Sequence, residues 1–337
     1  MEEDKRSGNL DRRKFLHKAG KIAGGLGALY LAATLPGCSQ NGDEACPVDE
    51  GPEASTEELP SPQETVEPPS GLVVVKGKSP AEMLQAGIVV WGGAEALDLA
   101  GKSVLIKVNA AFARPPQDAA TTDPELVAEA VRICNEAGAS RVVVFDHILQ
   151  DLVDQTLDAN GIGPAARDAG AEVIAYAVRK AGSARIVEIP GAIALPSAGI
   201  LEEIFQADFI IDMPKAKHHG GARLSLSMKN FIGCLQNMGQ MHQVDLQQAI
   251  AELNTVIKPS LVIMDATTIL LDKGPGGPGP TAEPGEVILG RDPVAVDSYT
   301  CGLFGISPLD LRYIVIGEQL GVGTSDFASL GVEEIVL

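Results

Sequence analysis

Residues 207–242 read ADFIIDMPKAKHHGGARLSLSMKNFIGCLQNMGQMH, and this stretch decides both the predicted fold and the place of the predicted site. Its apolar run Phe209–Met213 suits a strand covered on both faces, as in a parallel sheet. After that strand no acid occurs before Asp245, and the cationic or titratable side chains in between are Lys215, Lys217, His218, His219, Arg223, Lys229 and His242. We interpret this run as an anion-handling site.

The chain around this stretch is acidic. Its 337 residues carry a formal net charge of −19, and 45% of them are apolar while only 4% are aromatic. A chain of this length and composition can bury a large aliphatic core. Its negative charge makes nucleic acid and anionic lipid surfaces poor partners, so we expect no nucleic-acid partner.

Short apolar runs alternate with helical segments from Leu72 onward. The predicted strands are Leu72–Lys76, Ser103–Val108, Arg141–Phe145, Glu172–Ala175, Phe209–Met213, Leu261–Met264 and Val287–Leu289. The predicted helices are Asp123–Ala137, Pro164–Ala169, Leu246–Ile257 and Pro293–Leu303, with Asp123 and Asp292 as N-caps. This alternation predicts a single α/β domain over residues 72–337, with a doubly wound, mostly parallel sheet and helices on both faces.

Polar side chains stand at the carboxyl ends of these predicted strands. In open α/β sheets ligands bind beyond those ends, so we expect the polar side chains to share one crevice. Taken singly, an Asn or Asp there can instead form a turn or cap a helix, but lysine is needed for neither. The predicted ligand-binding residues are Lys107, Asn109, Asp146, Lys215, Lys217 and Asn230.

A helix is predicted after the lysines, because Leu224, Met228, Phe231 and Leu235 recur at helical spacing. Lys229 lies beside this stripe and near the expected crevice. There it can hold an anion, or act as a base or Schiff-base former if burial lowers its pKa. A solvated lysine on a helix face is an equally good interpretation.

The histidines are interpreted as follows. His218 directly follows Lys217, and we single it out as a proton carrier, with His242 and Lys229 as further catalytic candidates. His219 is expected to be exposed. A metal bound by Asp265 and Asp297 together with histidines is chemically feasible, but the spacing matches no standard metal motif. Residues 274–285, rich in glycine and proline, form a loop that is either a lid over the site or a passive surface crossover, and we favour the lid.

The amino-terminal residues indicate export. Residues 11–16, DRRKFL, resemble a twin-arginine motif, and the apolar run that follows is too short to span a bilayer unaided. Residues 35–38, LPGC, resemble a lipobox with Cys38 as the lipidated residue. We therefore predict a signal peptide over residues 1–37, recognised by the twin-arginine export machinery, and a lipid-anchored periplasmic or cell-surface protein. Residues 38–71, acidic and proline-rich, are predicted to form a disordered tether.

Taken together, these residues resemble a known family, the proteins grouped as domain of unknown function 362, over about Val73–Gly305. The likeness is carried by IKVN (106–109), Thr122 and Pro124, AGASRVVVFD (137–146), ADFIIDMPKAKHH (207–219), Lys229, Asn230 and Gly233, His242, Asp265 and Ala266, Gly274 and Pro275, and RDPVAVD (291–297). The family usually has proline where this chain has Val108. Some relatives carry ferredoxin-like 4Fe–4S modules, which implies a redox setting.

This chain lacks the cysteine repeats of such modules. Its cysteines are Cys38, Cys46, Cys134, Cys234 and Cys301, without a C-x-x-C pair, so a cysteine-ligated iron–sulfur cluster is not expected. The first functional hypothesis is a lipid-anchored enzyme that binds a small anionic or cofactor-like molecule. The alternatives are a non-catalytic solute- or cofactor-binding lipoprotein and a docking partner of a membrane redox complex.

Overall fold

The computed structural model describes residues 69–150 and 152–337. The predicted signal peptide, Cys38 and nearly all of the predicted tether lie outside the described residues. Within the described part of the chain, no helix has the length and hydropathy that crossing a bilayer requires.

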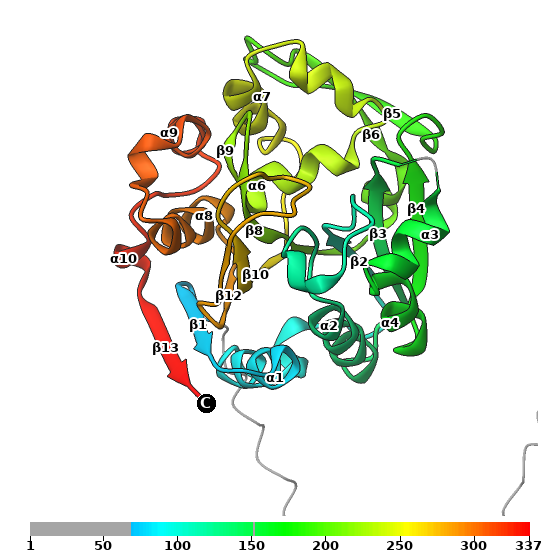
Figure 1. Cartoon of the computed structure of the whole chain (residues 1–337), viewed down its shortest axis with the longest axis vertical. Helices are drawn as coiled ribbons and strands as arrows, with labels where there is room; N and C mark the ends of the chain where they lie inside the picture. Colours follow the sequence, from blue (N-terminus) through cyan, green and yellow to red (C-terminus); the bar gives the residue numbers. More distant parts are fainter. Residues whose placement is uncertain (1–68, 151) are drawn as a thin grey trace, which may run out of the picture. The chain divides into compact units, whose positions relative to one another are not determined.

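Strands and helices alternate over much of the chain, interrupted by three runs of consecutive strands, β4–β6, β7–β9 and β10–β12 (Figure 1). The strands are β1 (Leu72–Lys76), β2 (Ser103–Val108), β3 (Arg141–Ile148), β4 (Glu172–Ala177), β5 (Ala184–Glu188), β6 (Ser197–Leu201), β7 (Phe209–Met213), β8 (Lys215–His219), β9 (Arg223–Ser225), β10 (Leu261–Leu270), β11 (Thr281–Ala282), β12 (Glu286–Gly290) and β13 (Val332–Val336). The α-helices are α1 (Pro80–Val90), α2 (Pro124–Glu136), α3 (Val153–Ala159), α4 (Ile162–Asp168), α5 (Glu202–Gln206), α6 (Ser227–Asn230), α7 (Leu246–Leu253), α8 (Pro293–Cys301), α9 (Arg312–Gln319) and α10 (Phe327–Leu330). The 3₁₀ helices are η1 (Ala94–Leu97), η2 (Pro116–Asp118), η3 (Phe231–Cys234), η4 (Met238–His242), η5 (Gly302–Phe304) and η6 (Pro308–Asp310).

The main sheet is doubly wound and mostly parallel, which confirms the predicted fold class. Its strand order is β13-β1-β12-β10-β7-β2-β3-β4. The chain builds β2, β3 and β4 outward in one direction, then returns to place β7 on the other side of β2 and β10 beyond it, with parallel pairing throughout. Only β12 runs antiparallel to both of its neighbours in this path. The winding direction therefore reverses between β2 and β7, and such a switch point leaves a crevice at the strands' carboxyl ends.

Both faces of the sheet are covered, because alternate strand residues feed two separate apolar clusters. In β2, Val104 and Ile106 pack with α1, α2 and α4, whereas Leu105 packs in the cluster formed with α6, α7, α8 and α9. Figure 1 shows these two groups of helices on opposite sides of the strands. Because successive side chains point to opposite faces and both faces are covered, every residue of such a strand is buried. This explains why the apolar runs in the sequence are continuous.

The two predicted N-caps, Asp123 and Asp292, are confirmed, whereas the helix predicted from Pro164 begins at Ile162. The Asp123 carboxylate accepts hydrogen bonds from the backbone N–H groups of Glu125 and Leu126 at the start of α2. Asp292 does the same for α8, and in both helices a proline occupies the first turn. A side chain that satisfies these free amides, followed by a proline that has no amide to satisfy, is the local reason that both helices begin where they do.

The segment after β7 differs from the prediction in two ways. No strand was predicted directly after Phe209–Met213, but the lysine-bearing residues there form strand β8, which pairs with β10 and makes a hairpin with β9. The expected helix over 224–235 is only the four residues of α6, which continue into η3. Asp297 accepts hydrogen bonds from the N–H groups of Ser227 and Met228, so a tertiary contact sets where this short helix begins.

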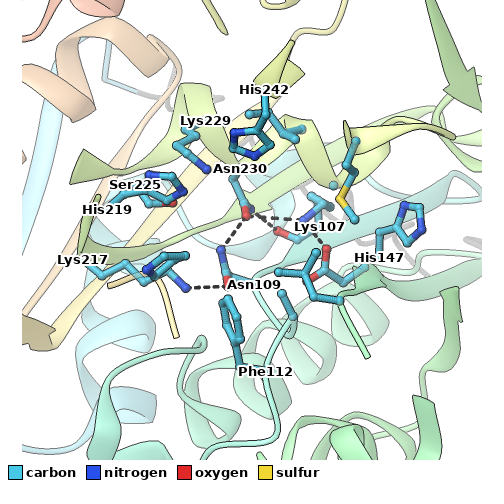
Figure 2. A pocket seen from close by; sticks show the side chains of 17 residues that line it. Lys107, Asn109, Phe112, His147, Lys217, His219, Ser225, Lys229, Asn230 and His242 are labelled. Atoms are coloured by element: carbon cyan, nitrogen blue, oxygen red, sulfur yellow. Dashed lines mark hydrogen bonds and ion pairs between the residues drawn. The ribbon is translucent and has the colours of Figure 1, made fainter. Parts of the chain in front are cut away.

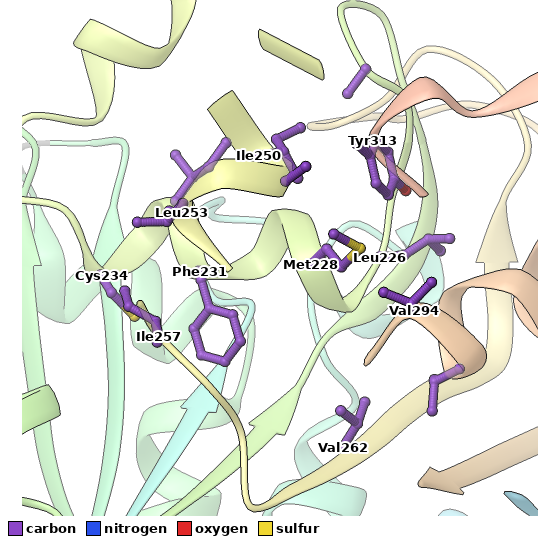
Figure 3. Close-up of a cluster of buried hydrophobic side chains, with 14 of the residues drawn as sticks. Leu226, Met228, Phe231, Cys234, Ile250, Leu253, Ile257, Val262, Val294 and Tyr313 are labelled. Carbon is purple, nitrogen blue, oxygen red and sulfur yellow. The ribbon is translucent and has the colours of Figure 1, made fainter. Parts of the chain in front are cut away.

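The apolar stripe itself is buried as predicted. Leu224, Met228, Phe231 and Leu235 are all at most 1% exposed. Figure 3 shows Met228 and Phe231 among side chains from α7, α8 and α9, including Ile250, Val294 and Tyr313. This packing fixes α6 and η3 against the sheet and so holds the polar residues on their other side in place.

The buried ion pair between Lys215 and Asp265 allows a test of the fold. The Lys215 Nζ lies 3.0 Å from a carboxylate oxygen of Asp265, and the two side chains are 2% and 0% exposed. Replacing Lys215→Met leaves the buried carboxylate without its counter-ion, so we expect a loss of about 3–5 kcal/mol in the free energy of unfolding. Urea denaturation measures this change.

Lys102→Met is the matched control, because it removes an ion pair whose side chains are 36% and 84% exposed. Exposed pairs contribute less than about 1 kcal/mol. Equal losses for the two variants would show that the Lys215 pair does not hold the sheet together.

Candidate functional site

A cavity of about 330 Å³ lies at the switch point, beyond the carboxyl ends of β2 and β7. Side chains from β2, β3, the β8–β9 hairpin, α6, η3 and η4 converge on it (Figure 2). The lining residues are Lys107, Asn109, Ala111, Phe112, Asp146, His147, Leu149, Lys217, His219, Ser225, Lys229, Asn230, Ile232, Gly233, Met238, His242 and Pro275. The position agrees with the crevice expected from the strand ends.

Lys107 is fully engaged within the protein. Its Nζ lies 2.7 Å from Asp146 Oδ1 and donates to Val108 O at 2.5 Å and to Asn230 Oδ1 at 3.4 Å. Both charged side chains are at most 4% exposed. Since an ammonium group has three N–H donors, all of the Lys107 donors are used and its charge is balanced by Asp146.

Asn230 connects three parts of the site. Its Nδ2 donates to Asp212 Oδ1 at 2.7 Å and to Lys107 O at 3.2 Å, and its Oδ1 accepts from Asn109 Nδ2 at 3.2 Å. Asn109 Oδ1 in turn accepts from Lys217 Nζ at 2.9 Å. Burial raises the pKa of Asp212 to about 7, although hydrogen bonds from Ser227 and Asn230 oppose that shift. This network fixes the orientation of both amides and of the Lys217 ammonium.

Lys217 is buried and, in its charged form, has one donor without a partner among the described residues. Its Nζ donates to Asn109 Oδ1 and to Ala120 O, and it lies 5.1 Å from the centre of the Phe112 ring. These two hydrogen bonds leave one of the three N–H groups free for a ligand. Burial, together with the positive charge of Lys229, lowers the pKa of Lys217 well below its usual value.

Lys229 differs from Lys107 and Lys217 in its contacts. It is half-buried against the cavity, and within the described residues its Nζ makes no hydrogen bond or ion pair. Burial and the positive charge of Lys107 lower the pKa of Lys229 to about 8. Three lysines therefore line the cavity, and Asp146 is the carboxylate among its lining residues. Asp146 is already paired with Lys107, so it does not balance the charge of the other two lysines.

His219 accepts two backbone hydrogen bonds, and these settle which ring nitrogen carries its proton. Its Nδ1 accepts from the backbone N–H groups of Gly221 and Ala222, both at 3.0 Å, so the ring proton of the neutral imidazole is on Nε2. Burial and the charges of Lys229 and Lys217 lower the pKa of His219 to about 3, which keeps the ring neutral above that pH. The exposed His242 lies nearly parallel to it, with ring centres 6.4 Å apart.

The rest of the cavity is largely apolar. Phe112, Leu149, Ile232, Met238 and Pro275 contribute to its wall. Pro275 belongs to the glycine- and proline-rich loop that we interpreted as a lid.

Other residues hold that loop against the site. Arg114 donates from its Nε to Gly276 O at 3.0 Å and from a terminal guanidinium nitrogen to Gly277 O at 3.2 Å. The N–H of Gly274 donates to His218 Nδ1 at 3.1 Å. The loop thus forms part of the wall.

Four predicted site residues lie elsewhere. Successive side chains of a strand point to opposite faces, so in β8 Lys217 and His219 face the cavity whereas His218 faces the loop at Gly274. Lys215 pairs with Asp265, which also accepts from Asp123 N and Thr267 N. Asp297 does not reach the cavity either, because its carboxylate accepts hydrogen bonds from the backbone N–H groups of Ser227 and Met228 in α6.

The structure therefore does not bring Asp265 and Asp297 together, because each carboxylate is occupied by different partners. Among the described residues, no group of three or more His, Cys, Asp or Glu side chains is arranged to hold a metal ion. The remaining predicted site residues, Lys107, Asn109, Asp146, Lys217, Lys229, Asn230 and His242, all line the one cavity.

Sequence reasoning missed several lining residues. His219 was expected to be exposed, yet it is only 7% exposed. If KAKHH had been recognised as a strand, its alternation would have grouped His219 with Lys217 rather than His218. Phe112, Ser225 and Met238 had no signal in the sequence. Phe112 lies in a bend, Met238 begins the short helix η4, and Ser225 lies on β9, a strand that the sequence pattern did not predict.

The described fold and site define an α/β protein with a cationic, partly apolar cavity at the switch point of a doubly wound sheet. The chain belongs to the family described as "Domain of unknown function (DUF362)", which matches residues 104–302. No curated protein matches this sequence.

One solved structure that shows some likeness is that of the lactate racemase apoprotein from Thermoanaerobacterium thermosaccharolyticum. It is 12% identical, with a TM-score of 0.36, and the alignment covers 68% of this chain. The chain spans 56% of the length of that structure.

Gly233 allows a test of how closely the site is packed. A Cβ at this position would lie 2.7 Å from Asp146 Oδ1 and 2.9 Å from Lys107 Nζ. Gly233→Ala must push this ion pair apart, so we expect it to lower the free energy of unfolding by about 1–3 kcal/mol. Chemical denaturation of the purified protein measures the change.

Gly302→Ala is the control, because Gly302 has helical dihedral angles and a Cβ there would meet nothing within 4 Å. This variant is expected to be neutral or more stable by about 0.4–1 kcal/mol. If Gly233→Ala behaved in the same way, the ion pair would have room that the structure does not show.

Proposed function

We propose that the cavity binds a small organic anion. The observation that carries this proposal is the Lys229 amine, which lines the cavity and has no hydrogen bond or ion pair within the described residues. Burying an amine costs free energy unless a partner compensates for the lost hydration. An anionic ligand would supply that partner, and the free N–H of Lys217 would supply a second contact.

The wall of the cavity indicates the rest of the ligand. Phe112, Ile232 and Met238 offer apolar surface beside the lysines. A volume of about 330 Å³ is near the lower end of the range for small-molecule sites, roughly 300–1,000 Å³. A compact carboxylate or phosphate ester with a flat or apolar body would match both the charge and the surface, and the neutral His219 Nε2–H would donate a further hydrogen bond.

Binding of the anion should couple to protonation. The pKa values of Lys217 and Lys229 are both lowered by burial and by neighbouring positive charge. An anion nearby favours the charged form and raises these pKa values again. The affinity should therefore be greatest where Lys229 is protonated, and should fall as the pH rises through about 8.

Benzoate is a suitable probe, because it combines a carboxylate with a flat apolar ring. Lys229→Met should weaken benzoate binding roughly tenfold to a hundredfold, as expected for losing one hydrogen bond to a charged group. The wild-type affinity should decline above the Lys229 pKa of about 8, and the variant should lose that part of the pH dependence. Isothermal titration calorimetry measures both effects.

Two controls make this experiment specific. Benzamide has nearly the same shape without the charge, so it should bind weakly and respond little to Lys229→Met. Lys258→Met removes an exposed lysine on the chain after α7 and should leave benzoate binding unchanged. Equal affinity for benzoate and benzamide, or equal effects of the two lysine substitutions, would refute the anion site.

We further propose that the protein is exported and anchored by lipid at Cys38. The support is the sequence alone, in which a twin-arginine motif precedes a short apolar run and a lipobox. The acidic, proline-rich tether would hold the domain away from the membrane surface, whose anionic lipids repel it. The small organic anion would then be met outside the cytoplasm.

Substitution of the cysteines tests this anchor. Cys38→Ser should release the protein into the soluble fraction and abolish incorporation of labelled fatty acid. Cys46→Ser, which removes the other cysteine of the amino-terminal region, should change neither result. If the Cys38→Ser protein sedimented with membranes as the wild type does, the proposed lipidation would be wrong.

A further inference from the structure

We propose that Lys229 is a nucleophilic amine that forms a reversible imine with the carbonyl carbon of a small 2-oxo acid. This inference rests on the proposed function, because the carboxylate of that acid would be held by the anion site. It adds a reaction class to the site and assigns the reacting atom, the Lys229 Nζ.

The three lysines of the cavity differ in how many of their donors are used. Lys107 has three acceptors, one of which is the carboxylate of its ion-pair partner Asp146. It is therefore held as a charged structural group. Lys217 donates to two oxygens and keeps one N–H for a ligand. Lys229 has no acceptor among the described residues, so no hydrogen bond or ion pair within that part of the chain holds its protons.

The surroundings of Lys229 also favour the neutral amine. A lysine becomes nucleophilic when it is desolvated or lies beside another cation, because both effects favour the uncharged form. Burial and the positive charge of Lys107 act on Lys229 in this way. Lys217 is the alternative nucleophile, but its Nζ is held by hydrogen bonds to Asn109 and Ala120. The Lys229 Nζ has no such contact among the described residues, so it can move as the geometry at a carbonyl carbon changes.

In a 2-oxo acid the carboxylate and the carbonyl group are on adjacent carbons. Two lysines that line the same cavity could therefore contact both groups at once, one binding the carboxylate and the other reacting with the carbonyl carbon. Lys217 and Lys229 interact electrostatically with each other and with His219. Figure 2 shows these three side chains on the same side of the view. Lys217 would hold the carboxylate, and the His219 Nε2–H would donate to the carbonyl oxygen. The apolar wall would accept the substituent on the other side of the carbonyl.

The reaction is balanced without an oxidant or a reductant. The lone pair of the neutral Lys229 amine forms a bond to the carbonyl carbon, and the carbonyl π electrons pass to oxygen. Proton transfer from nitrogen to that oxygen gives a carbinolamine. Loss of its hydroxyl group with one further proton releases water and forms the C=N bond, and uptake of a proton gives the iminium form.

Reductive trapping tests the inference. The purified protein is treated with benzoylformate, an aromatic 2-oxo acid, and sodium borohydride, and intact mass with peptide mapping locates the adduct. We expect one reduced adduct on Lys229 in the wild-type protein. Lys258→Met should react as the wild type does, whereas Lys229→Met should give no adduct above the level of urea-unfolded protein.

A second variant separates charge from nucleophilicity. Lys229→Arg keeps a cation in the cavity but removes the reactive amine. It should still bind benzoate and should form no adduct, which also guards against a variant that fails to fold. Trapping should increase as the pH approaches the Lys229 pKa of about 8, opposite to the trend expected for benzoate affinity.

The outcomes distinguish this inference from the proposed function. Specific benzoate binding without an adduct, or an adduct mapped to Lys217, would overturn the assignment of Lys229 and leave the anion site standing. Failure of benzoate to bind in a Lys229-dependent manner would refute the anion site itself. An adduct on Lys229 with normal benzoate binding would support both.

Discussion

The side chain of Asn230 is the contact on which the arrangement of the site depends. It joins β2 through Lys107 O, β7 through Asp212 and the end of β2 through Asn109, at the point where the winding of the sheet reverses. Because Asn230 is the last residue of α6, its hydrogen bonds also place Lys229, the residue before it. A buried amide that satisfies its donors and its acceptor in this way tolerates few alternative orientations. The backbone position of Lys229 therefore follows from the fixed Asn230 amide.

The charge of the cavity is opposite in sign to that of the chain as a whole. The chain carries a net charge of −19, yet its cavity collects three lysines against one ion-paired carboxylate. On the surface such lysines would be screened by water and neighbouring acids. In a partly apolar cavity their mutual repulsion and lost hydration persist, which is the reason that the pKa values of Lys217 and Lys229 are lowered. An anion is the simplest group that relieves both costs.

The thiols of the described cysteines contrast with these amines. Cys134 and Cys301 are buried, and burial raises the pKa of each thiol to about 12. Burial likewise raises the pKa of the Cys234 thiol. For a thiol the neutral form is the unreactive one, whereas for an amine it is the nucleophile. The same desolvation therefore keeps these thiols in their unreactive form and favours the neutral form of the Lys229 amine.

Much of the fold could be predicted because it depends on local pattern. Apolar runs such as Phe209–Met213 located the strands, and Asp123 and Asp292 each followed by proline located helix starts, since caps act within a few residues. The helix predicted over 224–235 was placed too early in the chain, because the contact that starts α6 at Ser227 comes from Asp297, far along the chain. No local pattern reveals such a contact.

The sequence by itself determined the doubly wound α/β fold, the burial of the Leu224 to Leu235 stripe and the grouping of lysines after β7. Only the tertiary structure decided which of those polar groups meet. The pleat of β8 turned His219 toward the cavity and His218 away from it, and Asp265 was taken by Lys215. Strand periodicity and capping act between near neighbours, whereas the pairing of a buried charge depends on which residues the completed sheet brings within hydrogen-bonding distance.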